Sequence, residues 1–406
     1  MIKKSTLAEV VEQQHLLQLK TESGYRRDLL SEINSSQNDF ALIISGIRRC
    51  GKSTLLKQLM EKTKKKYFFL NFDTARLYTF ASDDFALLDE LIAEKDYKIL
   101  FFDEIQVVDG WELFVRQKLD EGYQVVLTGS NATLLSKELG TKLTGRHITK
   151  ELFPFSYGEF CAYKTLKIEA DSFSDYLNSG GFPAFLKEQN IDVHTALLDD
   201  IIYRDVAVRH NIKDVHSLKH LVLFLASNVG NLISATKLKQ LIGIKSTATI
   251  LEYLGFFEQS YLIQLVPKFS YSYKAQVVNP RKVYFIDSGL QNAVTGSFNN
   301  DNGRKLENVV FWELRRMQKE LFYYNENGKE CDFVVCRNKT VEQVIQVCYE
   351  LNSDNEKREI DGLIDAMDFF KTAEGLILTF AQEDVISLGN KRIKVIPAFR
   401  YFGGQG

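Results

Sequence analysis

The sequence predicts an α/β protein: a parallel sheet covered by helices, then a helical segment, a small helix–strand module and a second α/β domain. Between residues 40 and 151, short apolar runs alternate with helical segments, a pattern typical of a parallel sheet covered on both faces. Between residues 234 and 287, two short Ser-capped helices precede two strands. After residue 289, the order is helix, three strands, helix and strand. A chain of 406 residues also exceeds what one core usually supports.

The first predicted domain spans residues 1–155. Its sheet strands are expected at the apolar runs 41–45, 67–71, 98–102, 124–128 and 147–153. Each run is short enough for a strand, and the segments between the runs are long enough for crossover helices.

Three further regions follow. Residues 156–212 are expected to be helical. Residues 213–287 contain two helices that start at Ser234 and Ser246, with strands near 261–266 and 282–287, which is the order of a winged helix. Residues 288–406 form the last domain, with helices 304–319 and 356–370, strands near 321–325, 331–337, 341–351 and 375–380, and a hairpin that turns at 389–390.

The charge is balanced, with 51 Lys and Arg against 53 Asp and Glu. This argues against a uniformly basic nucleic-acid-binding protein and leaves room for a local basic patch. No apolar run approaches the roughly 20 residues that span a bilayer. We therefore expect a cytoplasmic protein without a membrane partner.

The stretch that follows the first apolar run, "GIRRCGKS", fits G-x-x-x-x-G-K-[ST] completely. Glycines allow backbone N–H groups to turn toward phosphate oxygens, and the following helix directs its positive dipole end at the same oxygens. The lysine neutralises β- and γ-phosphates, and the serine hydroxyl is a Mg²⁺ ligand. The expected nucleotide-binding residues are Gly46, Arg48, Arg49, Cys50, Gly51, Lys52, Ser53 and Thr54.

An acidic pair is expected to complete this site. In "KILFFDEIQ", four apolar residues bury a strand and Asp103 follows at its end, where it can hold Mg²⁺ together with Ser53. Glu104 is placed to orient and deprotonate the attacking water. As an isolated feature, the pair could equally be an acidic loop after a strand.

The run "VVLTGSNA" brings Ser130 and Asn131 to the same sheet edge. Their hydroxyl or amide groups could sense the γ-phosphate or the attacking water. The alternative is that one of them only caps the next helix.

With these motifs, the chain resembles the AAA+-type P-loop ATPases of the additional-strand class. In particular, it is similar to a prokaryotic ATPase family that joins such a domain to a winged helix and a restriction-endonuclease-like domain. The resemblance rests on "GIRRCGKST", "FFDEIQ", "LTGS", "LTGRHITKELFPFSYGEF", "GGFPAFL", "YFIDSGL", "ENVVFWEL" and "ECDFVV". It implies that residues 156–212 form a helical lid.

The resemblance also implies that Arg146, in "LTGR", acts on the γ-phosphate, in cis or in trans. A salt bridge to a surface carboxylate is an equal alternative. Arg204 and Arg209 are weaker candidates for a sensing arginine in the lid. If Arg146 acts in trans, the protein must form an oligomer.

The region around the expected wing, "PKFSYSYKAQVVNPRK", combines cations with Tyr271 and Tyr273 and could contact a DNA backbone. The cations are Lys268, Lys274, Arg281 and Lys282. However, the expected recognition helix contains Glu252 and lacks Arg and Lys, which favours a protein partner over base readout.

The last domain has the element order of PD-(D/E)xK nucleases, which need a helix Glu, a strand-end Asp and a Glu/Gln-x-Lys around a cation. The chain offers Glu307 or Glu313 on the helix, then Asp332 and Gln346 on successive strands, and Glu350 could be a spare ligand. Cys348 stands where the lysine should be. We therefore expect a degenerate nuclease fold.

The leading hypothesis is a Mg²⁺-dependent ATPase in which nucleotide state moves the lid and winged helix against the C-terminal domain. ATP is preferred because no guanine-recognising Asn/Thr-Lys-x-Asp motif occurs. A slow ATP-dependent switch without DNA and a metal-dependent nuclease are the two alternatives.

Overall fold

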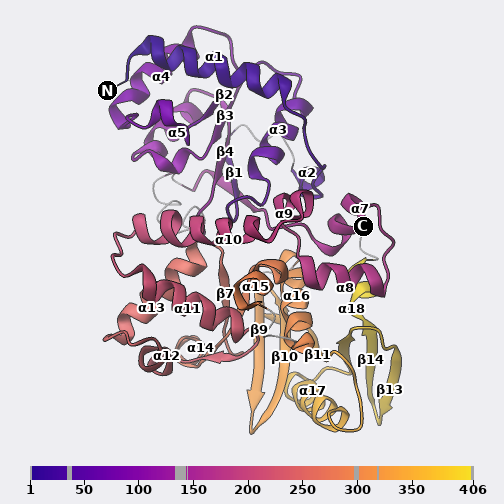
Figure 1. Cartoon of the computed structure of the whole chain (residues 1–406). Helices are drawn as coiled ribbons and strands as arrows, with labels where there is room; N and C mark the ends of the chain where they lie inside the picture. The colour runs from indigo at the N-terminus through magenta and orange to yellow at the C-terminus, as the bar shows by residue number, and fades with distance from the viewer. Residues whose placement is uncertain are drawn as a thin grey trace. The chain divides into compact units, whose positions relative to one another are not determined.

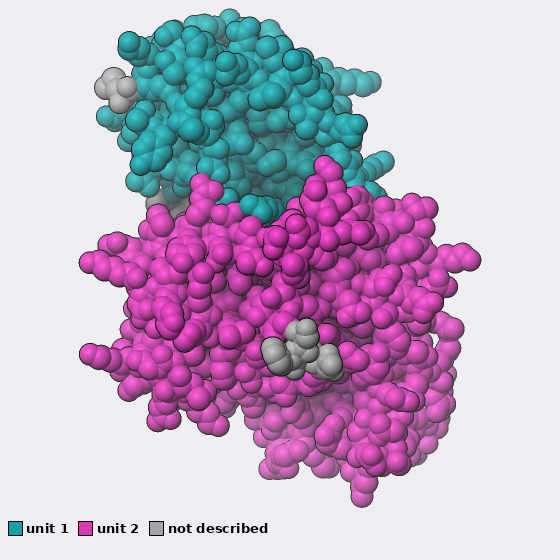
Figure 2. Space-filling model, in the orientation of Figure 1, with its two compact units in different colours: residues 1–153 teal, residues 154–406 magenta. Residues whose placement is uncertain are grey.

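The computed structural model describes residues 2–33, 39–132, 143, 145–296, 301–317 and 320–403. The chain divides into two compact units, Met1–Phe153 and Pro154–Gly406, which have separate colours in Figure 2. In these described ranges, none of the helices has both the length and the apolar character needed to cross a bilayer.

The first unit is built on a five-stranded parallel sheet with the strand order β2-β3-β4-β1-β5. The strands are β1 (Ala41–Ser45), β2 (Tyr67–Asn71), β3 (Ile99–Asp103), β4 (Gln124–Gly129) and β5 (His147–Glu151). The expected parallel sheet is therefore confirmed. Because all strands run in the same direction, the residues that follow β1, β3 and β4 share one edge of the sheet.

Helices cover both faces of this sheet (Figure 1). The helices are α1 (Lys4–Lys20), α2 (Leu29–Glu32), α3 (Lys52–Lys62), α4 (Phe85–Ala93) and α5 (Trp111–Asp120). Alternate strand residues, such as Leu100 and Phe102 of β3, enter one core with side chains of α1, α4 and α5. This follows from the two-residue period of a strand. Helix α3 packs on β3 and β4 and contributes Leu59 to an apolar pocket on the opposite face.

The second unit begins with helices. They are α7 (Tyr157–Lys164), α8 (Ala170–Ser179), α9 (Pro183–Glu188), α10 (Ile191–Asp200), a π-helical segment (Ile201–Val208) and α11 (Val215–Ser227). Pro183 occupies the first turn of α9, where its missing N–H costs no helical hydrogen bond.

A three-stranded antiparallel sheet follows, with the order β6-β8-β7. Its elements are β6 (Leu232–Ile233), α12 (Ala235–Ile242), α13 (Thr247–Gln259), β7 (Ile263–Val266), α14 (Tyr273–Val278) and β8 (Arg281–Phe285). The chain between β7 and β8, expected to be a plain wing, contains the short helix α14.

The last part carries a six-stranded mixed sheet with the order β13-β14-β12-β11-β10-β9. Its elements are α15 (Ser288–Thr295), α16 (Asn302–Met317), β9 (Glu320–Glu326), β10 (Lys329–Arg337), β11 (Thr340–Val347), α17 (Glu356–Phe370), β12 (Glu374–Thr379), β13 (Asp384–Leu388), β14 (Lys391–Pro397) and α18 (Ala398–Gly403). Strands β9 to β11 are antiparallel, whereas β11, β12 and β14 are parallel.

Buried hydrogen bonds connect the early helices of the second unit to its later elements. The Asp287 carboxylate accepts the Gly181 N–H at 2.7 Å, and the Glu313 carboxylate accepts the Tyr157 N–H at 3.0 Å. The Phe269 N–H donates to the Tyr323 carbonyl at 2.7 Å, which joins the three-stranded module to β9. A movement of residues 156–287 against the C-terminal domain would have to break the bonds from Tyr157 to Glu313 and from Phe269 to Tyr323.

Candidate nucleotide site

The loop between β1 and α3 has the backbone that a phosphate-binding turn requires. Gly51 has φ 104° and Arg49 has φ 63°, both in the left-handed region that turns N–H groups inward. Gly46 is fixed by packing, because a Cβ at this position would lie 2.0 Å from the Leu152 carbonyl oxygen. The first glycine of the motif is thus required by the close approach of the segment after β5 as well as by the loop.

Arg27 supports this loop and was not expected from the sequence. Its buried guanidinium donates to the Cys50 carbonyl at 2.7 Å and to the Phe153 carbonyl at 2.8 Å. The Cys50 thiol faces the Leu152 carbonyl at 3.2 Å, and burial raises its pKa, so the thiol is not reactive. Arg27 and Cys50 therefore have structural roles below the loop.

The Lys52 ammonium rests on the loop itself. It is 4% exposed and donates to the Gly46 and Ile47 carbonyls, both at 3.0 Å. It also lies 3.6 Å from a Glu104 carboxylate oxygen. Ser53 and Thr54 follow Lys52 in the first turn of α3, and Ser53 is exposed.

Asp103 ends β3 and is almost fully buried. The Thr128 hydroxyl of the neighbouring strand donates to one carboxylate oxygen, and the Asn71 amide donates to the other at 3.3 Å. Burial raises the pKa of Asp103, and Glu104 adds to this effect, while hydrogen bonds from Thr128 and Ser53 oppose it. The Ser53 hydroxyl and the Asp103 carboxylate thus meet, as a Mg²⁺ site of this type requires.

Glu104 follows with φ 52°, and its N–H donates to the Thr128 hydroxyl at 3.0 Å. The Gln106 amide donates to its carboxylate. Burial alone would raise the pKa of Glu104, but Lys52, Gln106 and Arg48 outweigh this and hold it below its usual value. The side chain is 19% exposed, so an ionised base is within reach of solvent.

Ser130 and Asn131 are buried at the end of β4. The Ser130 hydroxyl lies 3.5 Å from the Gln106 amide nitrogen and also hydrogen bonds to Glu104. The Asn131 carbonyl accepts the Ser45 hydroxyl at 3.0 Å. Ser130 therefore belongs to the surroundings of the expected base. The helix that either residue was expected to cap would fall at residues 133–142, outside the described residues.

Arg146 lies at the opposite edge of the sheet. It directly precedes β5, its carbonyl accepts the Ala41 N–H at the start of β1, and its guanidinium pairs with Asp120 at 2.6 Å. The sheet separates it from the loop by the length of a strand, roughly 13 Å at about 3.3 Å per residue. The structure does not bring Arg146 to the nucleotide site of its own chain, so a role there in cis does not fit.

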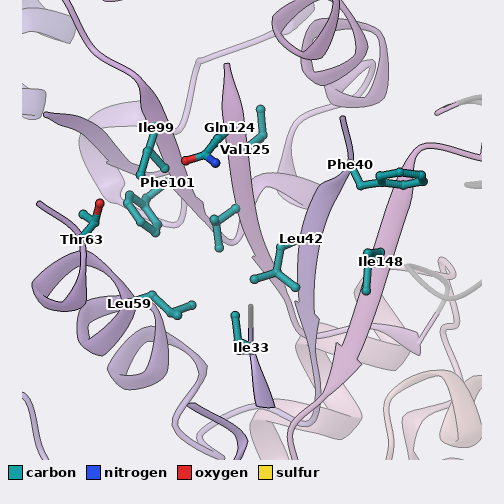
Figure 3. A pocket seen from close by; sticks show the side chains of 11 residues that line it. Ile33, Phe40, Leu42, Leu59, Thr63, Ile99, Phe101, Gln124, Val125 and Ile148 are labelled. Atoms are coloured by element: carbon teal, nitrogen blue, oxygen red, sulfur yellow. The ribbon is translucent and has the colours of Figure 1, made fainter. Parts of the chain in front are cut away.

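An apolar pocket on the α3 face also lies at this opposite edge (Figure 3). Leu42, Ile99 and Ile148 each lie within the first two residues of a strand and line the pocket from the sheet. Leu59 lines it from α3. Its volume of about 50 Å³ accommodates a few water molecules at most. This pocket is therefore not a nucleotide site.

The C-terminal candidates do not all come together. Glu307 and Asp332 come together, and Gln346 accepts the Asp332 N–H at 3.2 Å while its amide donates to Glu359. Glu313 does not join them, because it pairs with Arg316 and accepts from Tyr157. Glu350, the expected spare ligand, and Cys348, which stands at the position of the missing lysine, line a cleft beside α17.

Two of the four cations around the expected wing are used inside the second unit. Lys268 pairs with Glu326 at 2.8 Å, and Lys282 is buried among carboxylates. Tyr271 and Tyr273 are exposed, as expected for a contact surface. The expected basic wing is thus reduced to Lys274 and Arg281.

The two arginines expected as weaker candidates for a sensing role in the lid are both exposed. Arg204 lies in the π-helical segment, and Arg209 directly follows it.

A comparison with protein families identifies an AAA domain over most of the first unit. Residues 38–161 match the model of an AAA domain, and residues 170–301 match a domain of unknown function (DUF8612). Cdc6p from Pyrobaculum aerophilum aligns with 70% of this chain and 92% of its own, at 15% identity and a TM-score of 0.26. That score is too low to support an inference about this protein.

Two curated relatives extend over most of the chain. The uncharacterized protein MJ1544 of Methanocaldococcus jannaschii is 36% identical over 99% of this chain and 96% of its own length. An uncharacterized protein of Haemophilus influenzae is 32% identical over 84% of this chain and 89% of its own. The chain therefore carries an AAA-type ATPase domain and belongs to the family of these two proteins.

Proposed function

We propose that this protein is a Mg²⁺-dependent ATPase, with the nucleotide site at the carboxyl edge of the β2-β3-β4-β1-β5 sheet. The observation that carries the proposal is the convergence of Lys52, Asp103 and Glu104 at this edge. Lys52 approaches Glu104 to 3.6 Å, and the Asp103 carboxylate hydrogen bonds to the Ser53 hydroxyl. These groups come from the end of β3 and the start of α3, as triphosphate hydrolysis requires.

Each side chain has a separate role in this proposal. Lys52 neutralises phosphate oxygens, and the turn around Gly51 directs N–H groups at them. Ser53 and Asp103 would hold Mg²⁺, which fits their hard oxygen atoms and would supply charge neutralisation at the phosphates. Glu104 accepts the proton of the attacking water, because its lowered pKa keeps it ionised at neutral pH.

The test is steady-state ATP hydrolysis by the full chain and two variants. Glu104→Gln should bind ATP normally and lose roughly 10²- to 10⁴-fold in turnover, the usual contribution of a general base. Lys52→Ala should lose nucleotide binding. Exposed Asp109→Asn and Lys64→Ala are the matched controls and should behave as wild type. Undiminished hydrolysis by Glu104→Gln would remove the assigned base.

We also infer that the middle of the second unit is a winged-helix module that functions without DNA, so that ATP turnover serves as a switch. The order α11-β6-α12-α13-β7-β8 supports a winged helix. Against a DNA role, Lys268 and Lys282 are neutralised by carboxylates, and Phe269 packs on Phe370 at a ring-centroid distance of 4.7 Å. The region around the wing is thus engaged within its own unit.

The test of this second proposal compares ATP turnover with and without duplex DNA at several salt concentrations. Turnover should be unchanged, and DNA binding should be weak and lost with rising salt, as for non-specific contacts. Tight, salt-resistant binding that is lost in a Lys274→Ala, Arg281→Ala double variant would instead assign a DNA partner.

A further inference from the structure

A buried lysine from the three-stranded module occupies the nuclease-like carboxylate pocket. Lys282 of β8 is 2% exposed. Its ammonium lies 2.7 Å from Asp332 Oδ1, 3.2 Å from Glu307 Oε1 and 2.6 Å from Glu330 Oε1. One cation thus contacts carboxylates from α16 and β10 at hydrogen-bond distance.

This position is the one that a bridging metal ion would need. In a site of this type, a divalent cation bridges the helix carboxylate and the strand-end carboxylate. Here the Lys282 ammonium bridges Glu307 and Asp332 instead. It is a single charge with three donors, so it satisfies carboxylate oxygens without any other ligand.

Two protein donors also hydrogen bond to the Glu307 and Asp332 carboxylates. Tyr284 donates its hydroxyl to Glu307 Oε1 at 2.7 Å, and the Val347 N–H donates to Asp332 Oδ2 at 2.9 Å. Across the described residues, no group of three His, Cys, Asp or Glu side chains could hold a metal ion. The Glu307 and Asp332 carboxylates are therefore paired to a cation of the same chain and held by protein donors.

We propose that Lys282 is the permanent cation of this pocket, where it replaces a divalent metal ion and connects the three-stranded sheet to the six-stranded sheet. The domain then needs no metal to fold and cannot place a metal against a phosphodiester. Removal of the ammonium should leave two adjacent buried carboxylates, which is the donor set that hard divalent cations prefer.

The experiment uses Mn²⁺ as the probe and the full chain in an Asp103→Asn background, so that the nucleotide site contributes no metal binding. Mn²⁺ binding is measured by titration calorimetry and electron paramagnetic resonance, and stability by the thermal unfolding midpoint. The parent should bind no Mn²⁺ at the pocket, and Mn²⁺ should leave its midpoint unchanged.

Lys282→Ala should unfold at a lower temperature and should gain one Mn²⁺ per chain, which raises its midpoint. Addition of Asp332→Asn should abolish that gain. Lys282→Met, which keeps the aliphatic stem, provides a second variant. If neither variant folds without metal, refolding with MnCl₂ should recover Lys282→Ala.

Three results would overturn the proposal. The first is Mn²⁺ binding by the parent that Asp332→Asn removes. The second is a folded Lys282→Ala chain that gains no Mn²⁺, or an unfolded one that Mn²⁺ does not recover. The third is Mn²⁺-dependent nicking of plasmid DNA by the parent that is lost in Lys282→Met, because Lys282 would then be a catalytic group of an active nuclease.

Discussion

The Lys52 ammonium lies 3.6 Å from the Glu104 carboxylate, so the phosphate-binding cation and the expected base are partners within the site. Lys52 also donates to the Gly46 and Ile47 carbonyls. A triphosphate would compete for this ammonium, since phosphate oxygens are stronger acceptors than neutral carbonyls. Glu104 would then lose the neighbour that most lowers its pKa and become a stronger base. In the proposed mechanism, nucleotide binding and activation of the base would thus be coupled through one lysine.

Gln106 should position Glu104 for this chemistry. Its amide donates to the Glu104 carboxylate and helps to lower the pKa of that group. In Gln106→Ala, the pKa of Glu104 should rise, and the acidic limb of the pH–rate profile should move upward by up to about one unit, the size of one hydrogen bond. The KM for ATP should be unchanged.

Exposed Gln117 of α5, which contacts Asp89 of α4 and Glu121 just after α5, provides the control. Gln117→Ala should keep the wild-type profile. A profile of Gln106→Ala that loses amplitude without any shift along the pH axis would assign Gln106 a purely structural role.

The same site shows which features can be predicted from the sequence. The glycine loop and the pair Asp103 and Glu104 were predictable, because each depends on a local motif after an apolar strand. The contacts from Thr128 and Asn71 were not, because they depend on the strand order β2-β3-β4, which local patterns do not determine. Thr128 is the next-to-last residue of β4 and precedes Gly129, which is too weak a signal to identify Thr128 as a partner of Asp103.

Arg146 and Lys282 show two different limits of structure prediction from the sequence. A residue that precedes a parallel strand lies at the amino edge of the sheet, so the predicted topology already places Arg146 away from the phosphate-binding loop of its own chain. The position of Lys282 did not follow, because its carboxylate partners are distant in sequence and belong to another module. Long-range ion pairs of this kind have no local pattern.

We expect Arg146 to act on the nucleotide of a second copy of the chain, because the nucleotide site of its own chain is a strand length away. Arg146→Ala should then bind ATP and lose turnover. A mixture with Lys52→Ala, which keeps Arg146 but lacks a functional loop, should recover part of the turnover. Both variants alone should be inactive.

Asp120→Ala is the matched control, since it breaks the 2.6 Å pair and retains the arginine. It should keep wild-type turnover. Full activity of Arg146→Ala, or a mixture without recovery, would restrict Arg146 to its salt bridge with Asp120.

Gly180 should be among the positions least tolerant of substitution in the second unit. It has φ 68° and ψ −166°, a region that is essentially limited to glycine, and a Cβ would lie 2.1 Å from a buried Asp287 oxygen. Gly180→Ala should reduce the free energy of unfolding by at least about 3 kcal/mol, through backbone strain and displacement of Asp287.

Gly389 provides a comparison because it also has positive φ, at 63°, while a Cβ there would meet nothing within 4 Å. Gly389→Ala should cost about 1 kcal/mol from the left-handed backbone alone. Urea unfolding of both variants measures the difference. Equal losses would show that the contact with Asp287 contributes little.

His194 should make the second unit less stable in mild acid. The side chain is fully buried, and its ring stacks on Phe185 at a centroid distance of 4.1 Å. Burial lowers the pKa of His194, although Asp287 and the Ser179 backbone oppose this. As the pH falls below about 6.5, the unfolded chain binds a proton that the folded chain excludes. Stability is therefore lost as the pH falls from that value toward the folded pKa, by up to about 1.4 kcal/mol per pH unit.

His194→Phe should remove about one proton from this dependence, because phenylalanine fills a similar volume and does not titrate. The measurement is the free energy of unfolding by urea between about pH 5 and pH 8, the range in which histidine changes charge. His147 and His210, whose pKa values burial also lowers, should account for part of the dependence that remains. If a folded His194→Phe chain keeps the wild-type dependence of stability on pH, His194 accepts its proton in the folded state. The nearby Asp287 carboxylate would then stabilise the charged ring.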